Sequence, residues 1–168
     1  MAHECLPDPQ PDAPPGVATR DTNLNMHDIF LPKTDAEIES CFDVFSVLRP
    51  NLTRQEFLPR VRRQEQQGYQ IAALRSGDLI ASAAGFRISD FLAWGRVLYI
   101  DDLSTLQNLR GQGHAGAILD WLTNYASGQS CDAMHLDTGY ARHAAHRVYL
   151  SKGFELNCHH LAKAIQKQ

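Results

Sequence analysis

A glycine-rich segment in the second half of the chain constrains the fold more than any other feature. Residues 110–116 read RGQGHAG and separate a strand-like run, 96–105, from a run with helical spacing. Glycine lets the backbone take positive φ and approach a ligand closely. The first turn of a helix adds unpaired N–H groups and a partial positive charge. We therefore expect a strand, a phosphate-binding loop and a helix, in that order.

The chain upstream of this segment predicts two helices. Thr34 and Glu37 form a capping box, and so do Thr53 and Glu56, so each pair should start a helix. We expect order to begin near Thr34. Pro59 lies inside the second pattern and should kink this helix or delay its start.

The remaining patterns predict a mixed α/β sheet with helices on both faces. Apolar and β-branched runs bounded by turn residues indicate strands, and residues 76–78 read as a hairpin turn. A strand, helix and strand in succession should place two parallel strands in the sheet. The expected strands are 69–74, 79–86, 96–105, 133–137 and 154–161, and the later helices start near residues 115 and 142.

The glycine-rich segment fits two cofactor classes. Gly111, Gly113 and Gly116 match the spacing of the dinucleotide fingerprint, and Asp137 follows about 20 residues later. However, residues 106–110 intervene between the strand and the first glycine, and only 52 residues remain after Gly116. A nicotinamide-dinucleotide enzyme is therefore the less favoured alternative.

The same residues also fit the pattern Gln/Arg-x-x-Gly-x-Gly/Ala. Arg110, Gly113 and Ala115 satisfy it position by position. This pattern resembles the acetyl-CoA signature of the GNAT N-acetyltransferase superfamily.

A second block of this superfamily lies downstream at the expected separation. Its usual form is Asn-x-x-Ala-x-x-x-Tyr followed by Gly-Phe, and Ala145, Tyr149, Gly153 and Phe154 match it. Arg142 replaces the asparagine that contacts the pantetheine arm in relatives, which puts this one contact in doubt. The resemblance implies a GNAT fold and direct transfer of an acetyl group from acetyl-CoA to the amine of a small substrate, in a ternary complex. A non-catalytic acyl-CoA-binding module on the same fold is the alternative.

The resemblance also implies roles for individual residues. The strand LYIDDL, 98–103, is similar to that of the diamine acetyltransferases, where the first acid of the pair is the candidate base. This assignment makes Asp101 the base for a small cationic amine. Tyr149 would protonate the leaving sulfur. The expected cofactor-binding residues are Leu103, Ser104, Thr105, Arg110, Gly111, Gln112, Gly113, His114, Ala115, Gly116 and Arg142.

Geometry and chemistry leave other roles open for these side chains. Alternation along a strand should send Asp101 and Asp102 to opposite faces of the sheet. Both could instead be solvated acids at a strand end, and Tyr149 could be a core aromatic. His143 and His146 are three residues apart, but no third ligand accompanies them at a recognisable spacing, so we expect no metal.

Composition narrows the function classes further. The formal net charge is −3, which argues against a general nucleic-acid binder. No apolar run approaches the roughly 20 residues that span a bilayer. Residues 1–26 are rich in proline and should form a flexible tail, followed by a single domain, 27–168. Because the N-terminus also lacks the pattern of a signal peptide, we expect a cytoplasmic protein without membrane or nucleic-acid partners. A homodimer stays open.

Overall fold

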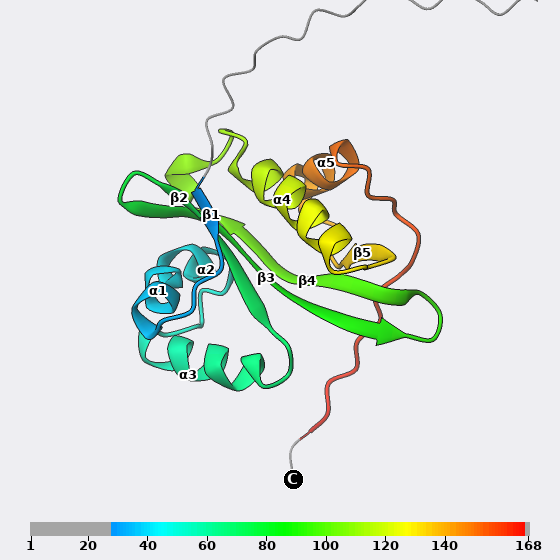
Figure 1. Ribbon diagram of the computed structural model, residues 1–168, viewed down its shortest axis with the longest axis horizontal. Helices are drawn as coiled ribbons and strands as arrows, with labels where there is room; N and C mark the ends of the chain where they lie inside the picture. Colours follow the sequence, from blue (N-terminus) through cyan, green and yellow to red (C-terminus); the bar gives the residue numbers. More distant parts are fainter. Residues whose placement is uncertain (1–27, 167–168) are drawn as a thin grey trace, which may run out of the picture.

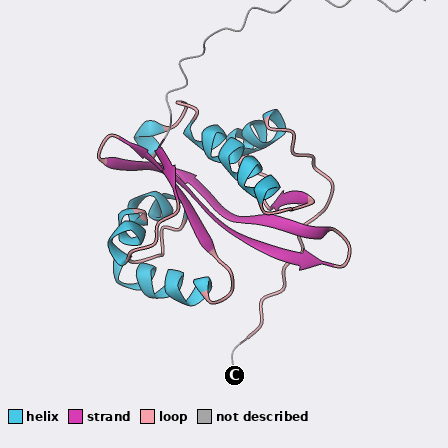
Figure 2. Cartoon of the chain, viewed as in Figure 1, coloured by secondary structure: helices cyan, strands magenta, loops and turns pink. Residues whose placement is uncertain are grey.

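The computed structural model describes residues 28–166, so the expected tail lies outside the described part. Its centre is a five-stranded mixed sheet (Figures 1 and 2). Neighbouring strands from the first to the fourth are antiparallel, and the fifth is parallel to the fourth. In sheet order the strands are β1 (Asp28–Phe30), β2 (Gln70–Ser76), β3 (Leu79–Phe91), β4 (Gly95–Thr105) and β5 (Ala133–Leu136). The predicted mixed α/β class is confirmed.

Helices cover both faces of this sheet (Figure 1). On one face lie α1 (Asp35–Ser40), α2 (Phe42–Leu48) and α3 (Arg54–Glu65), and on the other lie α4 (His114–Gly128) and α5 (His143–Ser151). A short 3₁₀ helix, η1 (Gln107–Leu109), joins β4 to the loop before α4. None of the described helices is long and apolar enough to cross a membrane.

Each face of the sheet has its own hydrophobic core. Ile71 and Ala73 of β2 pack with Phe45 and Phe57 on the α1–α3 face. Leu98 belongs to the α4–α5 face. Burial on both faces explains why the central strands read as nearly continuous apolar runs rather than as strict alternations.

The helix starts on the α1–α3 face are set by local hydrogen bonds. The Thr34 side chain accepts from the Glu37 N–H, and Thr53 accepts from the Glu56 N–H, so both predicted capping boxes are present. The capping box starts α3 at Arg54, and Pro59 lies within the helix; the expected delayed start is wrong. An interior proline costs about 3 kcal/mol and a cap contributes about 1 kcal/mol, so the burial of Phe57 and Val61 also supports this helix.

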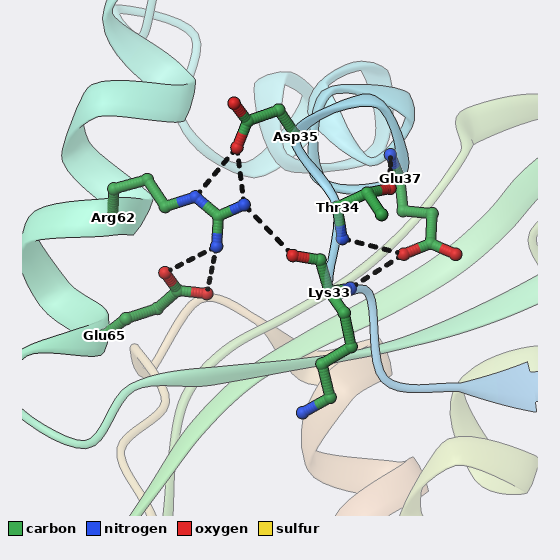
Figure 3. Close-up of polar contacts among 6 residues, drawn as sticks. All are labelled: Lys33, Thr34, Asp35, Glu37, Arg62 and Glu65. Carbon is green, nitrogen blue, oxygen red and sulfur yellow. Dashed lines mark hydrogen bonds and ion pairs between the residues drawn. The ribbon is translucent and has the colours of Figure 1, made fainter.

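Arg62 of α3 forms hydrogen bonds that connect α3 to α1 (Figure 3). Its Nε donates to Asp35 Oδ1 at 2.9 Å, and its Nη1 donates to Glu65 Oε2 at 2.9 Å. Nη2 also donates to the Lys33 carbonyl at 3.0 Å. These bonds join α3 to the first residue of α1 and to the backbone that leads into it.

Three boundaries differ from the sequence expectations. The described residues already contain a strand, β1, ahead of the expected start of order near Thr34. The first helix is divided at Cys41, whose N–H bonds to the Ile38 carbonyl. The expected strand 154–161 is wrong, because none of the described residues after α5 is in a strand. Leu156 and Leu161 are 73% and 90% exposed. A strand needs a neighbouring edge to satisfy its backbone groups, and this segment has paired with none.

Candidate active site

The acidic pair lies at an irregularity between β3 and β4. Gly85 pairs with Asp102 and Phe86 pairs with Ile100, so Asp101 is an extra residue on β4 with no partner opposite it. Such a bulge interrupts the alternation of side chains. The expectation that the two carboxylates point to opposite faces is therefore wrong: Asp102 bonds to Arg49 and Tyr69, and Asp101 bonds to Arg87, which also bonds to Gln64 of α3. Both carboxylates line a cavity of about 1990 Å³ that extends from the α1–α3 layer to α5.

Asp102 is held from two sides. Arg49, the residue that ends α2, donates to Asp102 Oδ1 through Nε at 2.9 Å and through Nη2 at 2.6 Å. The Tyr69 hydroxyl donates to Asp102 Oδ2 at 3.3 Å. Both carboxylate oxygens thus have a partner within the protein. Burial, followed by the charges of the two aspartates, raises the pKa of Tyr69, so it stays a hydrogen-bond donor.

Asp101 is held from one side only. Arg87 of β3 donates to Asp101 Oδ2 through Nε at 2.8 Å, and Arg87 also reaches Gln64 and the ring of Tyr69. No group among residues 28–166 donates a hydrogen bond to Asp101 Oδ1. Burial raises the pKa of Asp101, and Arg87 opposes that shift. Asp101 is therefore a partly buried carboxylate with one oxygen available to a ligand.

Gly85 lets Tyr69 reach this site. A Cβ built on Gly85 would overlap the hydroxyl and ring of Tyr69. Gly85 faces Asp102 across the β3–β4 ladder, so the ring passes over the glycine and ends at the carboxylate. An isolated glycine in a strand pattern often marks such a close approach.

The carboxyl half of β4 has no partner on its β5 side. Parallel pairing between the two strands ends at Ile100 and Leu136, whereas β4 continues to Thr105. Among the described residues, no strand pairs with this edge from position 101 onward. Backbone groups on that edge are available to an extended ligand, which could pair with them as an added strand would.

Side chains on this stretch differ in their availability. Leu103 lines the cavity. Ser104 is buried and donates to the Val44 carbonyl at 2.7 Å, and Thr105 Oγ1 lies 2.9 Å from Ser82 Oγ. The hydroxyls of Ser104 and Thr105 are therefore used within the protein, which leaves their backbone groups as the candidates for binding.

The glycine-rich segment forms the entry to α4. The helix starts at His114, which is buried, so the last three residues of the predicted loop are already helical. Gly113 caps the helix at φ +83°, with no side-chain hydrogen bond at the cap, and Gly111 has φ +78°. Apart from the adjoining backbone, no atom of residues 28–166 lies within 4 Å of a Cβ built on either glycine, so the space beside this backbone is open.

The other residues of this segment surround that open backbone. Arg110 and Gln112 are exposed, while Ala115 and Gly116 are half-buried in the first turn of α4. Lys152 lies across Gly116 and forms an ion pair with Asp120. Residues 110–116 do not line the cavity that contains the acidic pair. The structure therefore separates the predicted phosphate-binding loop from the predicted base.

Tyr149 and Arg142 join α5 to the same cavity as the acidic pair. Tyr149 packs edge-on against Phe154, with ring centroids 5.8 Å apart, and it also lines the cavity. Burial raises the pKa of Tyr149, and the nearby charge of Arg142 opposes that shift. Tyr149 thus packs against Phe154 and also contributes to the lining of the cavity.

Sequence reasoning missed Arg49, Arg87 and Tyr69. Arg49 directly follows α2, Arg87 is on β3 and Tyr69 directly precedes β2. Only tertiary contact brings them to the acidic pair. Gly85 within a strand was the available signal, since glycine there indicates a bulge or a close approach.

The chain has relatives among known proteins. The model of the acetyltransferase (GNAT) family matches residues 33–154. An uncharacterized N-acetyltransferase of Bacillus subtilis is 26% identical over 126 residues, which cover 74% of this chain and 89% of that protein.

Solved structures share the fold at low sequence identity. An aminoglycoside N-acetyltransferase crystallised with CoA has a TM-score of 0.71 at 14% identity, covering 84% of this chain and 97% of that one. A putative acetyltransferase from Agrobacterium tumefaciens has the same TM-score at 23% identity, covering 82% and 99%. Because the family model spans most of the chain, the protein belongs to the acetyltransferase (GNAT) family.

Proposed function

We propose that this protein transfers the acetyl group of acetyl-CoA to the amine of a small substrate, by direct attack in a ternary complex. The observation that carries the proposal is the meeting of three features at one cavity. Among the described residues, Asp101 has a carboxylate oxygen without a donor, β4 has a backbone edge without a partner strand, and Tyr149 has a half-buried phenol. Residues 27–168 would form one acetyltransferase domain.

Asp101 is the better candidate for the base. An alkyl ammonium has a pKa of about 10.4, so the acceptor must lose a proton before it can attack. Both oxygens of Asp102 already accept hydrogen bonds from Arg49 and Tyr69, whereas Oδ1 of Asp101 has no donor among the described residues. The raised pKa of Asp101 also makes it a stronger base than an exposed aspartate.

Tyr149 is the candidate acid for the departing thiolate. Its raised pKa keeps the phenol protonated at neutral pH, so it can donate a hydrogen bond or a proton. Arg142, the residue before α5, lines the same cavity, and its positive charge acts on Tyr149.

Acetyl-CoA supplies the activated acetyl group, and two parts of the chain fit it. The backbone at Gly111 and Gly113 is open, and it leads into the positive end of α4, which suits a pyrophosphate. The free edge of β4 at Leu103, Ser104 and Thr105 suits a pantetheine arm, and a backbone N–H there would stabilise the oxyanion. The other proposed contacts at the helix entry are Arg110, Gln112, His114, Ala115 and Gly116.

A thermal-shift experiment tests the cosubstrate site. Acetyl-CoA should raise the Tm, because a ligand that binds only the native state stabilises it. Gly113→Leu should abolish this shift, since a side chain would occupy the open space beside the loop. Gly77→Leu is the matched control: Gly77 also has positive φ and open surroundings, but it lies in the β2–β3 turn. An unchanged shift in Gly113→Leu would contradict the assignment.

Catalysis needs a separate measurement. A screen of small amines with acetyl-CoA, read as released thiol, should identify at least one acceptor. A protein that shows the thermal shift but releases thiol with no amine would be a non-catalytic acyl-CoA-binding module instead.

A further inference from the structure

The charges around the cavity balance. Among the described residues that line it, five are Arg or Lys and five are Asp or Glu. A site for a polycation needs a surplus of carboxylates, because like charges repel the ligand as it loses its water. With equal numbers of positive and negative side chains, this cavity has no surplus of carboxylates for a polycation.

The balance holds at the acidic pair itself. Arg87 pairs with Asp101 at 2.8 Å and Arg49 pairs with Asp102 at 2.6 Å. The charge of Arg49 also acts on Asp101. An ammonium group that approaches Asp101 therefore meets two guanidinium groups as well as two carboxylates. A negative group on the same ligand would offset that repulsion.

Arg49 is placed to bind such a negative group. Its side chain is 55% exposed, against 16% for Asp102, and it lines the cavity. Nε and Nη2 both donate to one oxygen of Asp102, while Nη1 has no acceptor among the described residues. A guanidinium has five N–H donors in a planar fork, so it can hold Asp102 and a ligand carboxylate together.

The other arginines of the cavity are less suited to this role. Arg60 forms an ion pair with Glu56 of its own helix, and Arg87 is engaged by Asp101 and Gln64. The charge of Arg142 opposes the rise in the pKa of Tyr149, the residue proposed to protonate the leaving thiolate.

We propose that the acceptor is an amino-carboxylate, that is, a small molecule with both an amine and a carboxylate group, such as an amino acid. Its amine faces Asp101 Oδ1, and its carboxylate binds Nη1 of Arg49. This inference rests on the proposed acetyl transfer and names its substrate class. It also separates this chain from enzymes that acetylate polycationic aminoglycosides.

Three matched acceptor panels test the inference with the full-length protein and acetyl-CoA, read as released thiol. The first contains the standard amino acids, the second their carboxamides, and the third the corresponding amines without the carboxyl group. We expect the best amino acid to exceed its own amide and amine by roughly tenfold to a hundredfold in kcat/KM, the range expected for a charge-assisted hydrogen bond. The difference should lie mainly in KM.

Arginine variants locate the preference. Arg49→Gln should reduce it to less than about threefold, and Arg49→Lys should retain part of it. Arg54→Gln is the matched control, since Arg54 is 59% exposed and pairs with Asp43, but does not line the cavity. It should keep the full preference.

Several outcomes would overturn the inference. One is turnover of an amide or a plain amine as fast as that of the amino acid, and another is an unchanged preference in Arg49→Gln. An equal loss for all three panels in Arg49→Gln would make Arg49 only a support for Asp102. If no thiol is released with any of the three panels or with any other amine, the proposed function itself is contradicted. If thiol is released only with amines outside the panels, the inference about the substrate class is wrong.

Discussion

The two faces of the sheet assemble their candidate residues in different ways. On the α1–α3 face, the acidic pair of β4 is held by Arg49, Tyr69 and Arg87, which come from three other segments. On the α4–α5 face, the candidates lie in two short continuous runs, 110–116 and 142–154. The first arrangement depends on long-range contacts, and the second on local backbone geometry. A sequence motif can therefore reveal the glycine-rich run, the α5 run and the acidic pair, but not the side chains that hold the acidic pair in place.

The largest effect is expected from a substitution in the acidic pair. Asp101→Asn keeps the shape of the side chain and removes the base, so kcat/KM at neutral pH should fall by roughly 10²- to 10⁴-fold. In the wild type, activity should fall as pH drops through the raised pKa of Asp101, because the protonated carboxyl cannot accept the amine proton. The variant should lose that acidic limb and recover partly at high pH, where free amine is abundant.

Asp102→Asn is the comparison for this variant. It should be milder and should keep the acidic limb, since both oxygens of Asp102 already accept hydrogen bonds, from Arg49 and Tyr69. A pH–rate profile of each variant distinguishes the two carboxylates. A silent Asp101→Asn beside a severe Asp102→Asn would reverse the assignment.

A second change tests the cosubstrate side. Tyr149→Phe keeps the ring that packs against Phe154 and removes the phenol, so turnover should fall by roughly 10- to 10³-fold while acetyl-CoA affinity stays nearly constant. Tyr125→Phe is the control, since its hydroxyl bonds to Gln70 and does not line the cavity. Intact turnover in Tyr149→Phe would leave Tyr149 as a packing residue.

A smaller effect distinguishes how tightly the two faces are packed. Gly85→Ala should lower the free energy of unfolding by about 1–3 kcal/mol, the usual cost of overpacking, because the new methyl group overlaps the buried Tyr69. Chemical denaturation measures the change. Tyr69→Phe in the Gly85→Ala background should recover part of the loss if the hydroxyl is the obstacle, and no recovery would show that the ring itself is.

The smallest expected effect is the same substitution on the opposite face. Gly116→Ala should change the free energy of unfolding by less than about 1 kcal/mol. The helix preference of alanine over glycine offsets the crowding that the new methyl group causes. The atom that a Cβ would meet, Cε of Lys152 at 3.2 Å, belongs to a flexible side chain that can move. A loss as large as that of Gly85→Ala would mean that this face is packed as rigidly as the other.

Much of the local structure could be predicted from the sequence. The capping boxes at Thr34 and Thr53, the turn after Ser76 and the helix that follows the glycines all depend on hydrogen bonds or backbone angles within a few residues. The mixed sheet also followed from the order of these elements. The roles of Asp101, Tyr149 and residues 110–116 stay predictions until the variants are measured.

Features that depend on a partner strand or on a distant side chain were decided only by the tertiary structure. Strand alternation predicted opposite faces for Asp101 and Asp102, but the register with β3 adds an unpaired residue at Asp101 and brings both carboxylates to one cavity. The run 154–161 had a strand-like pattern, yet a strand forms only where another edge accepts its backbone hydrogen bonds. Likewise, no spacing in the sequence links Arg49 to Asp102, 53 positions away, because their contact depends on how α2 packs against β4.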